Sequence, residues 1–365
     1  MLDVNKINKA YPQPANTTYL STSSFGLISK SSIDTAHDFH EEVYNTGSKR
    51  VEHFIAEELP RIRKVVCEFM DAPIQELALI PNFSYGLCAI IPAISILKRV
   101  LLFRNDYPSL IQPFLINDFN IHWIDSKDGF TIDMEELKES IIQNKIEILA
   151  ISHVQYLSGF KIDIDELGAF CKQNDVLFIL DGTQGLGAFP FSFNESTVNI
   201  YLTSNYKWMN GGFGTGIMCM KEETIKKFPP KSGGFGSYKF LDEHWKYSPS
   251  INSYEPGLLN FPGLIMLEEA IKFKNRVGLE KIASHNMNLL AKFMEDMDST
   301  SIDVCGPGII KNRCNIVGIL GGEGLEKSLA KKGVIVKMRN EIIRIGIHFY
   351  NTEEDIDRLI SSLKS

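Results

Sequence analysis

Several features that mark whole classes of protein are missing from this 365-residue sequence. No apolar run approaches the roughly 18 residues that a membrane-spanning helix needs, and the N-terminal stretch has no secretory-signal pattern. The six cysteines are scattered singly without a Cys-x-x-Cys pair, which argues against a zinc site or a redox dithiol. A formal net charge of −7 argues against nucleic acid as the main partner. We therefore expect a cytoplasmic protein, outside the membrane, with reduced and mostly buried thiols.

The middle of the chain alternates short apolar segments with helical ones. A helical pattern over residues 31–70 comes first and is interrupted at Gly47. Strands are then predicted at 76–80, 99–103, 121–125, 145–151, 176–180, 199–203 and 215–220. Helices are predicted between them at 84–97, 109–117, 133–143 and 163–173. Since these strands are apolar on both faces, the pattern predicts an α/β fold with a mainly parallel seven-stranded sheet covered by helices.

The C-terminal third differs from the middle of the chain in its composition and in the pattern of its apolar residues. Residues 229–257 are rich in Gly, Pro, Ser and aromatic side chains and show little periodicity, so we expect an irregular segment with a functional role. Elements beyond it are predicted at 260–276, 278–297, 324–332 and 352–364 (helices) and at 315–320, 334–338 and 342–347 (strands). The expected domains are an N-terminal segment (1–30), a large domain (31–275) and a small α+β domain (276–365).

Polar side chains cluster just after the predicted strands, where parallel sheets bind ligands. Asp181 and Gln184 follow the strand at 176–180. Ser204, Tyr206 and Lys207 follow the strand at 199–203 and precede a Gly-rich turn. Asp181 alone also fits an ordinary turn residue, since aspartate before glycine is common in turns.

Two further strand ends add to this set. Ser84 and Tyr85 follow the strand at 76–80 and begin a helix, whose N-terminal N–H groups suit a phosphate. Tyr107 follows the strand at 99–103 and offers an aromatic ring, although it also fits a core position.

These residue types match the needs of pyridoxal 5′-phosphate (PLP). A lysine such as Lys207 forms a Schiff base with the cofactor aldehyde and later moves the substrate Cα proton. An acid such as Asp181 keeps the pyridine nitrogen protonated, because an opposite charge nearby favours the charged form. The cofactor phosphate needs N–H and hydroxyl donors, and an aromatic side chain holds the ring flat.

In this pattern the sequence resembles the class V aminotransferase family, whose relatives include cysteine desulfurases, kynureninases and isopenicillin N epimerases. The family motif D-x-x-H/Q, then S-x-H/Y-K and a Gly-rich turn, appears as Asp181, Gln184, Ser204, Tyr206 and Lys207. The resemblance implies the aspartate-aminotransferase-like PLP-transferase fold. It also implies a homodimer with the active site at the interface.

Other motifs of the family extend the resemblance over essentially the whole chain. The segment ISHVQYLSG points to Gln155 as a contact of the cofactor oxygen, and NDYPS points to Tyr107 as the ring-stacking residue. The ending IIRIGIHFYNTEEDID places Arg344 where the family binds the substrate carboxylate; without the resemblance, Arg344 would fit a solvated sheet face. One departure is Leu258, which stands where the family often has a phosphate-binding threonine from the partner subunit.

The reaction type is less specified. Desulfurases need a thiol on a loop shortly before the carboxylate-binding arginine, whereas the stretch from Gly333 to Arg344 holds no cysteine. Our leading expectation is an aminotransferase that passes the amino group of an amino acid to a 2-oxo acid. The alternative is a lyase or epimerase of the same fold, cysteine or selenocysteine lyase-like or epimerase-like; a non-catalytic PLP-binding protein is the remote alternative.

Overall fold

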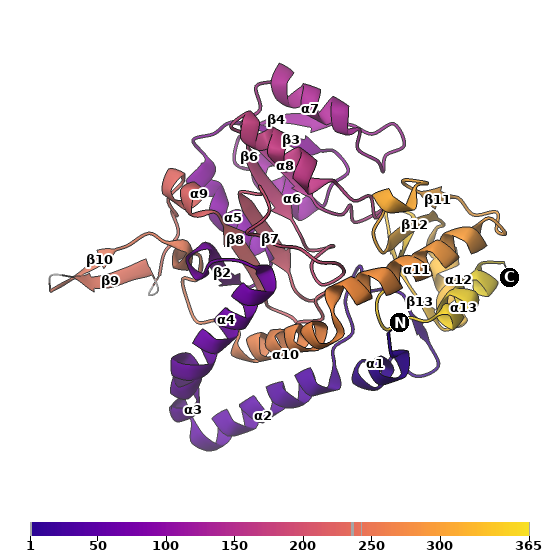
Figure 1. The fold of residues 1–365 in the computed structure, drawn as a ribbon, viewed down its shortest axis with the longest axis horizontal. Coiled ribbons are helices and arrows are strands. Elements are labelled where there is room, and N and C mark those ends of the chain that lie inside the picture. The colour runs from indigo at the N-terminus through magenta and orange to yellow at the C-terminus, as the bar shows by residue number, and fades with distance from the viewer. Residues whose placement is uncertain (1, 235–236, 242, 365) are drawn as a thin grey trace.

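The computed structural model describes residues 2–234, 237–241 and 243–364, and its centre is a seven-stranded sheet (Figure 1). The strands are β2 (Leu77–Ile80), β3 (Arg99–Phe103), β4 (Asn120–Ile124), β5 (Ile148–Ser152), β6 (Leu177–Asp181), β7 (Ile200–Ser204) and β8 (Gly216–Met220). Their order is β2-β8-β7-β6-β5-β3-β4, and only β8 runs antiparallel to its neighbours. The predicted fold class is confirmed.

Helices cover both faces of this sheet, which explains why the strands are apolar throughout. The crossover helices are α5 (Phe83–Ile94), α6 (Pro108–Leu115), α7 (Met134–Gln143) and α8 (Ile164–Gln173), with the short α9 (Glu222–Lys227) after β8. Successive side chains of one strand point to opposite faces. In β5, Leu149 and Ile151 therefore join one apolar cluster, while Ile148 and Ala150 join the other.

The N-terminal helices frame the large sheet on one side. They are α1 (Val4–Ala10), α2 (Lys30–Thr46), α3 (Ser48–His53) and α4 (Leu59–Met70), with a π-helical turn at Phe54–Glu58. Gly47 separates α2 from α3 with φ 59°, a conformation that glycine adopts readily, as the sequence predicted. The long helix α10 (Phe261–Val277) packs along α2 (Figure 1).

A second, antiparallel sheet lies at the other end of the molecule (Figure 1). Its strands are β11 (Val304–Cys305), β12 (Ile316–Leu320), β15 (Ile342–Gly346) and β14 (Lys337–Arg339), in that order. Helices α11 (Leu279–Met297), α12 (Glu323–Lys331) and α13 (Glu353–Lys364) pack with it. The N-terminal strand β1 (Thr18–Tyr19) pairs in parallel with β13 (Val334–Ile335), so both chain ends meet here. The domain division at residues 30 and 275 stays a prediction.

The segment 229–257 differs from our expectation of irregular structure. It contains a hairpin of β9 (Tyr238–Leu241) and β10 (His244–Tyr247), followed by a 3₁₀ turn at Ile251–Tyr254. The hairpin extends away from the sheet (Figure 1). Tight hairpin turns usually contain Asn-Gly or Asp-Gly, because these residues adopt positive φ angles readily. Here the residue with a positive φ is Glu243, at 64°. The sequence therefore carried no turn signal at this place.

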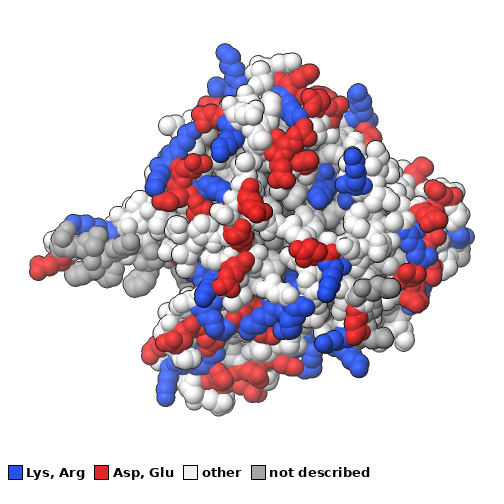
Figure 2. Space-filling model, in the orientation of Figure 1, with Lys and Arg blue, Asp and Glu red and all other residues white. Residues whose placement is uncertain are grey.

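The surface carries charges of both signs. Figure 2 shows acidic and basic side chains interspersed over the visible face. Among the described residues, no helix is both long and apolar enough to cross a membrane.

Candidate active site

A cavity of about 280 Å³ lies at the carboxyl ends of the parallel strands. Ser152 ends β5, Asp181 ends β6 as its direct neighbour in the ladder, and Ser204 ends β7. The cavity is lined by Asn82, Phe83, Ser84, Tyr107, Ser152, Tyr156, Asp181, Thr183, Gln184, Ser204, Tyr206 and Lys207. Seven of the ten residues predicted from the sequence thus line one cavity, while Tyr85, Gln155 and Arg344 are not among its lining residues.

Lys207 projects from the turn that follows β7, and only 7% of it is exposed. Its Nζ lies 5.5 Å from the ring centre of Tyr107 and 5.9 Å from that of Tyr206. Burial lowers the pKa of Lys207 to about 7, and the positive charge of Arg344 acts in the same direction. A large share of this amine is therefore neutral near pH 7, which is the form that attacks a carbonyl.

Asp181 is the carboxylate whose negative charge acts on the Lys207 amine, opposing the lowering of its pKa. One carboxylate oxygen accepts a hydrogen bond from the backbone N–H of Thr183 at 2.9 Å, the local bond that a turn aspartate makes. Burial raises the pKa of Asp181 to about 6, against the effects of Thr183 and Lys207. The carboxylate is still mainly ionised at pH 7, so it can hold a positive charge on a bound ring.

At the α5 end of the cavity, the hydroxyls of Ser84 and Ser204 line the wall and can donate to a phosphate. Asn82 caps α5 by accepting from the N–H of Tyr85, and the hydroxyl of Ser204 accepts from the N–H of Phe83 at 3.0 Å. Ser84 faces the cavity from the first turn, whereas Tyr85 is 37% exposed and lies outside it. The prediction for Tyr85 as a contact within this chain therefore lacks support from the geometry.

Gln184 joins two distant parts of the chain. Its amide nitrogen donates to the backbone oxygen of Ser23 at 3.1 Å, and its amide oxygen accepts from the indole N–H of Trp208 at 2.7 Å. The side chain lines the cavity, but these bonds already engage both of its polar atoms. Gln184 thus links the N-terminal segment at Ser23 to Trp208, the residue that follows Lys207.

Asp106 is a site residue that the sequence reasoning missed. It is 3% exposed and accepts from the N–H and hydroxyl of Ser152, from the N–H of Tyr107 and from the amide of Gln155. No cation forms an ion pair with it among the described residues, and burial raises its pKa. Its position directly before Tyr107 in NDYPS was the available signal. Asp106 therefore holds the backbone at Tyr107 and the side-chain amide of Gln155 in place.

We expect Asp106→Asn to weaken cofactor binding about tenfold to a hundredfold, because an amide nitrogen replaces an oxygen that accepts hydrogen bonds from buried donors. Titration of the apo protein with PLP, followed by visible absorption, measures the dissociation constant. Ser152→Ala is the matched control, since it removes one donor and leaves the carboxylate. An unchanged constant in Asp106→Asn would contradict the role.

Arg344 lies on β15, beside the cavity, and is 3% exposed. Its Nη2 donates to the hydroxyl of Ser24 at 2.6 Å and its Nη1 to the backbone oxygen of Tyr156 at 3.3 Å, while its buried Nε has no partner in the described part of the chain. Burial lowers its pKa to about 10, so it remains charged at pH 7. No carboxylate forms an ion pair with Arg344 among the described residues. The solvated-face alternative is wrong, because all of β15 is buried.

The arrangement fits PLP. The cavity supplies a buried lysine with a lowered pKa, an ionisable acid, a phenol ring and a helix N-terminus with hydroxyls. Two buried polar atoms around it, Oε1 of Gln155 and Nε of Arg344, have no hydrogen-bond partner among the residues that the structure describes. Unsatisfied buried groups are costly, which favours a polar ligand at this place.

Comparisons with known proteins agree with this chemistry. The sequence profile of the aminotransferase class-V family matches residues 18–359, so the chain belongs to that family. Membership confirms the family prediction and pyridoxal phosphate as the cofactor of the family. A probable cysteine desulfurase of Pyrococcus abyssi is 20% identical, with 98% of this chain and 96% of that protein aligned.

Two solved structures share the fold. A cysteine desulfurase from Thermococcus onnurineus superposes with a TM-score of 0.90 at 19% identity, covering 100% of this chain and 98% of the other. The cystine C–S lyase C-DES, in complex with cysteine persulfide, gives 0.87 at 16% identity and covers 97% and 99%. These relatives fit the lyase alternative better than the aminotransferase that we expected first.

Proposed function

We propose that this chain is a PLP-dependent lyase that cleaves the Cβ–S bond of an amino acid such as cysteine or cystine. The observation that carries the amino-acid substrate is the buried guanidinium of Arg344, which has hydrogen bonds to Ser24 and Tyr156 but no carboxylate partner among the described residues. A buried charge of this kind needs an anion, and an α-carboxylate matches the planar fork of arginine. The proposed specificity for a sulfur-containing amino acid is supported by the similarity to cysteine desulfurases and to a cystine C–S lyase.

The roles of the chain's own residues follow from their positions. Lys207 binds the cofactor and, as a free amine, takes the Cα proton; Asp181 holds the positive charge on the ring nitrogen. Bound PLP supplies the electron sink that stabilises negative charge at Cα. Tyr107 would contact the bound ring, Gln155 and Tyr206 would offer polar contacts to the cofactor, and Arg344 would hold the substrate carboxylate.

The cysteines favour direct release of sulfur over transfer to an enzyme thiol. None of the six lines the cavity, and only Cys88, on α5, is exposed. Burial raises the pKa of Cys305 and of Cys314 to about 11, so neither is a ready thiolate. With cysteine as substrate and one water consumed, the products are hydrogen sulfide, pyruvate and ammonia.

A single experiment separates the possible reactions. We expect the holo-protein, given L-cysteine or L-cystine without any keto acid, to accumulate pyruvate and ammonia in equal amounts while its visible band persists. Transamination would instead bleach the band once, and a keto acid would restore it. No pyruvate with any sulfur amino acid would overturn the lyase proposal.

The pKa of Lys207 predicts a pH dependence. The amine must lose its proton to attach PLP, and its pKa of about 7 means that the neutral fraction grows as pH rises. We expect the initial attachment rate to rise about fivefold from pH 6 to 7 and only about twofold more by pH 8. Stopped-flow absorption of apo protein mixed with PLP measures it. A rate still rising tenfold per unit above pH 8 would contradict the lowered pKa.

We also propose a homodimer. Several large apolar side chains are exposed in the single chain: Phe25 (50%), Phe213 (56%) and Leu258 (78%). Phe25 and Phe213 contact the ring of Tyr206, so this exposed group adjoins the cavity. A partner subunit would cover it.

A further inference from the structure

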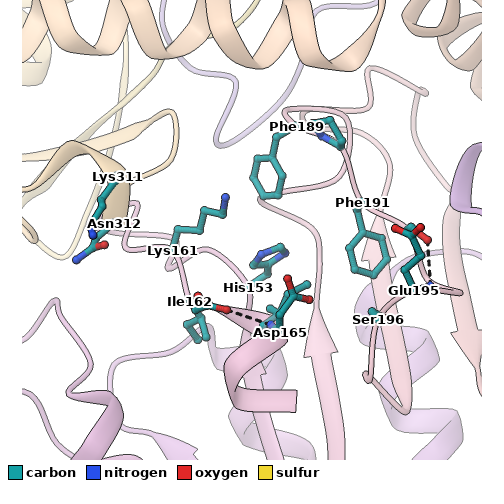
Figure 3. Close-up of a pocket in the computed structure, with 14 residues that line it drawn as sticks. His153, Lys161, Ile162, Asp165, Phe189, Phe191, Glu195, Ser196, Lys311 and Asn312 are labelled. Carbon is teal, nitrogen blue, oxygen red and sulfur yellow. Dashed lines mark hydrogen bonds between the residues drawn. The ribbon is translucent and has the colours of Figure 1, made fainter. Parts of the chain in front are cut away.

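A second cavity, of about 470 Å³, is lined by a different set of residues from the cofactor cavity (Figure 3). Its walls come from the loop after β5, from the first turn of α8, from the segment after β6 and from residues 311–312. None of its lining residues lines the cofactor cavity. Its volume is in the range of small-molecule sites.

His153 is the buried polar group of this cavity. It is 3% exposed, and its ring makes no hydrogen bond among the described residues. The rings of Phe189 and Phe191 lie edge-on to it, at 5.1 and 6.4 Å between centres (Figure 3). The imidazole nitrogens are therefore free to donate a hydrogen bond to, or accept one from, a ligand in this cavity.

Charges of opposite sign flank the aromatic rings. The ammonium of Lys161 lies 4.5 Å from the ring centre of Phe189, and Asp165 projects from the first turn of α8 (Figure 3). Neither forms an ion pair, with the other or elsewhere, in the part of the chain that the structure describes. The remaining charged groups on the cavity wall are Asp163, Glu195 and Lys311.

We infer that this cavity is a second binding site, for a small zwitterion with an apolar body, of the kind of a free hydrophobic amino acid. Lys161 binds its carboxylate and Asp165 binds its ammonium group. His153 donates or accepts one hydrogen bond, and the two phenylalanine rings pack against the apolar part. A simple anion or cation is disfavoured, because the wall holds unpaired groups of both signs.

The site adjoins the catalytic one through the backbone. Ser152 lines the cofactor cavity and the next residue, His153, lines the second cavity. The N–H of His153 donates to the backbone oxygen of Asp181 at 2.9 Å. The two cavities therefore share one strand end.

Calorimetric titration of the holo-protein tests the inference, with L-phenylalanine as the probe. We expect it to bind at least about tenfold more tightly than 3-phenylpropionate, which lacks the ammonium, and phenethylamine, which lacks the carboxylate. Lys161→Met and Asp165→Asn should each weaken the binding at least about tenfold. Lys172→Met, an exposed lysine at the far end of α8, is the matched control and should leave it unchanged.

Arg344→Leu separates this site from the active site, which also accepts amino acids under the proposed function. Binding that survives in Arg344→Leu and is lost in Lys161→Met supports the second site. Binding lost in Arg344→Leu and unchanged in Lys161→Met would assign the heat to the active site and overturn the inference. If L-phenylalanine did not bind to the wild-type protein, the inference would also be overturned, while the lyase proposal would be unaffected.

Discussion

Replacement of Lys207 by alanine is expected to reduce turnover by about 10³- to 10⁴-fold or more, because it removes both the covalent attachment and the Cα proton carrier. The cavity keeps Asp181, Ser84 and Ser204, so PLP should still bind. Without the covalent bond, dialysis should remove the cofactor and the visible band with it. Pyruvate release and visible absorption before and after dialysis measure the two effects.

A control separates this loss from general damage. Lys221→Ala also removes a partly buried amine, which donates to the backbone oxygen of Phe193 at 2.7 Å and lies outside the cavity. We expect this variant to keep its activity and its band after dialysis. Undiminished turnover in Lys207→Ala would refute the assignment of this lysine.

Replacement of Arg344 by leucine is expected to lower kcat/KM for amino-acid substrates by about a hundredfold to a thousandfold, since the carboxylate loses its buried partner. The decrease in kcat/KM should come mainly from an increase in KM. A second result should accompany it: the positive charge of Arg344 helps to lower the pKa of Lys207, so the attachment profile should move to higher pH. A structural defect alone would not produce that shift.

Arg339→Gln is the matched control for Arg344→Leu. Arg339 lies on the adjoining strand β14 and is exposed, although its charge also reaches Lys207 and Arg344. Solvent screens an exposed charge, so we expect a small change in kcat/KM. If both variants behaved alike, the carboxylate role of Arg344 would be wrong.

Much of the architecture was predictable from local patterns. Short continuous apolar runs located the seven strands, and the period of 3.6 located the four crossover helices, to within a few residues, because burial on both faces leaves each strand apolar throughout. The hairpin β9–β10 was missed, because its positive-φ residue is Glu243, at 64°, and not the glycine or asparagine that usually signals a hairpin turn. Polar residues at strand ends revealed the site, because parallel strands bring their carboxyl ends to one edge.

The sequence by itself determined the family and the cofactor, and it indicated seven of the residues that line the cavity, because these lie in short motifs just after the strands. Only the tertiary structure brought Ser24 to Arg344 across 320 residues and brought Asp106 to Ser152 and Gln155. It alone also set the pKa values of Lys207 and Asp181 near neutrality, because burial is a property of the folded chain. The reaction depends on such distant contacts, which no local pattern records.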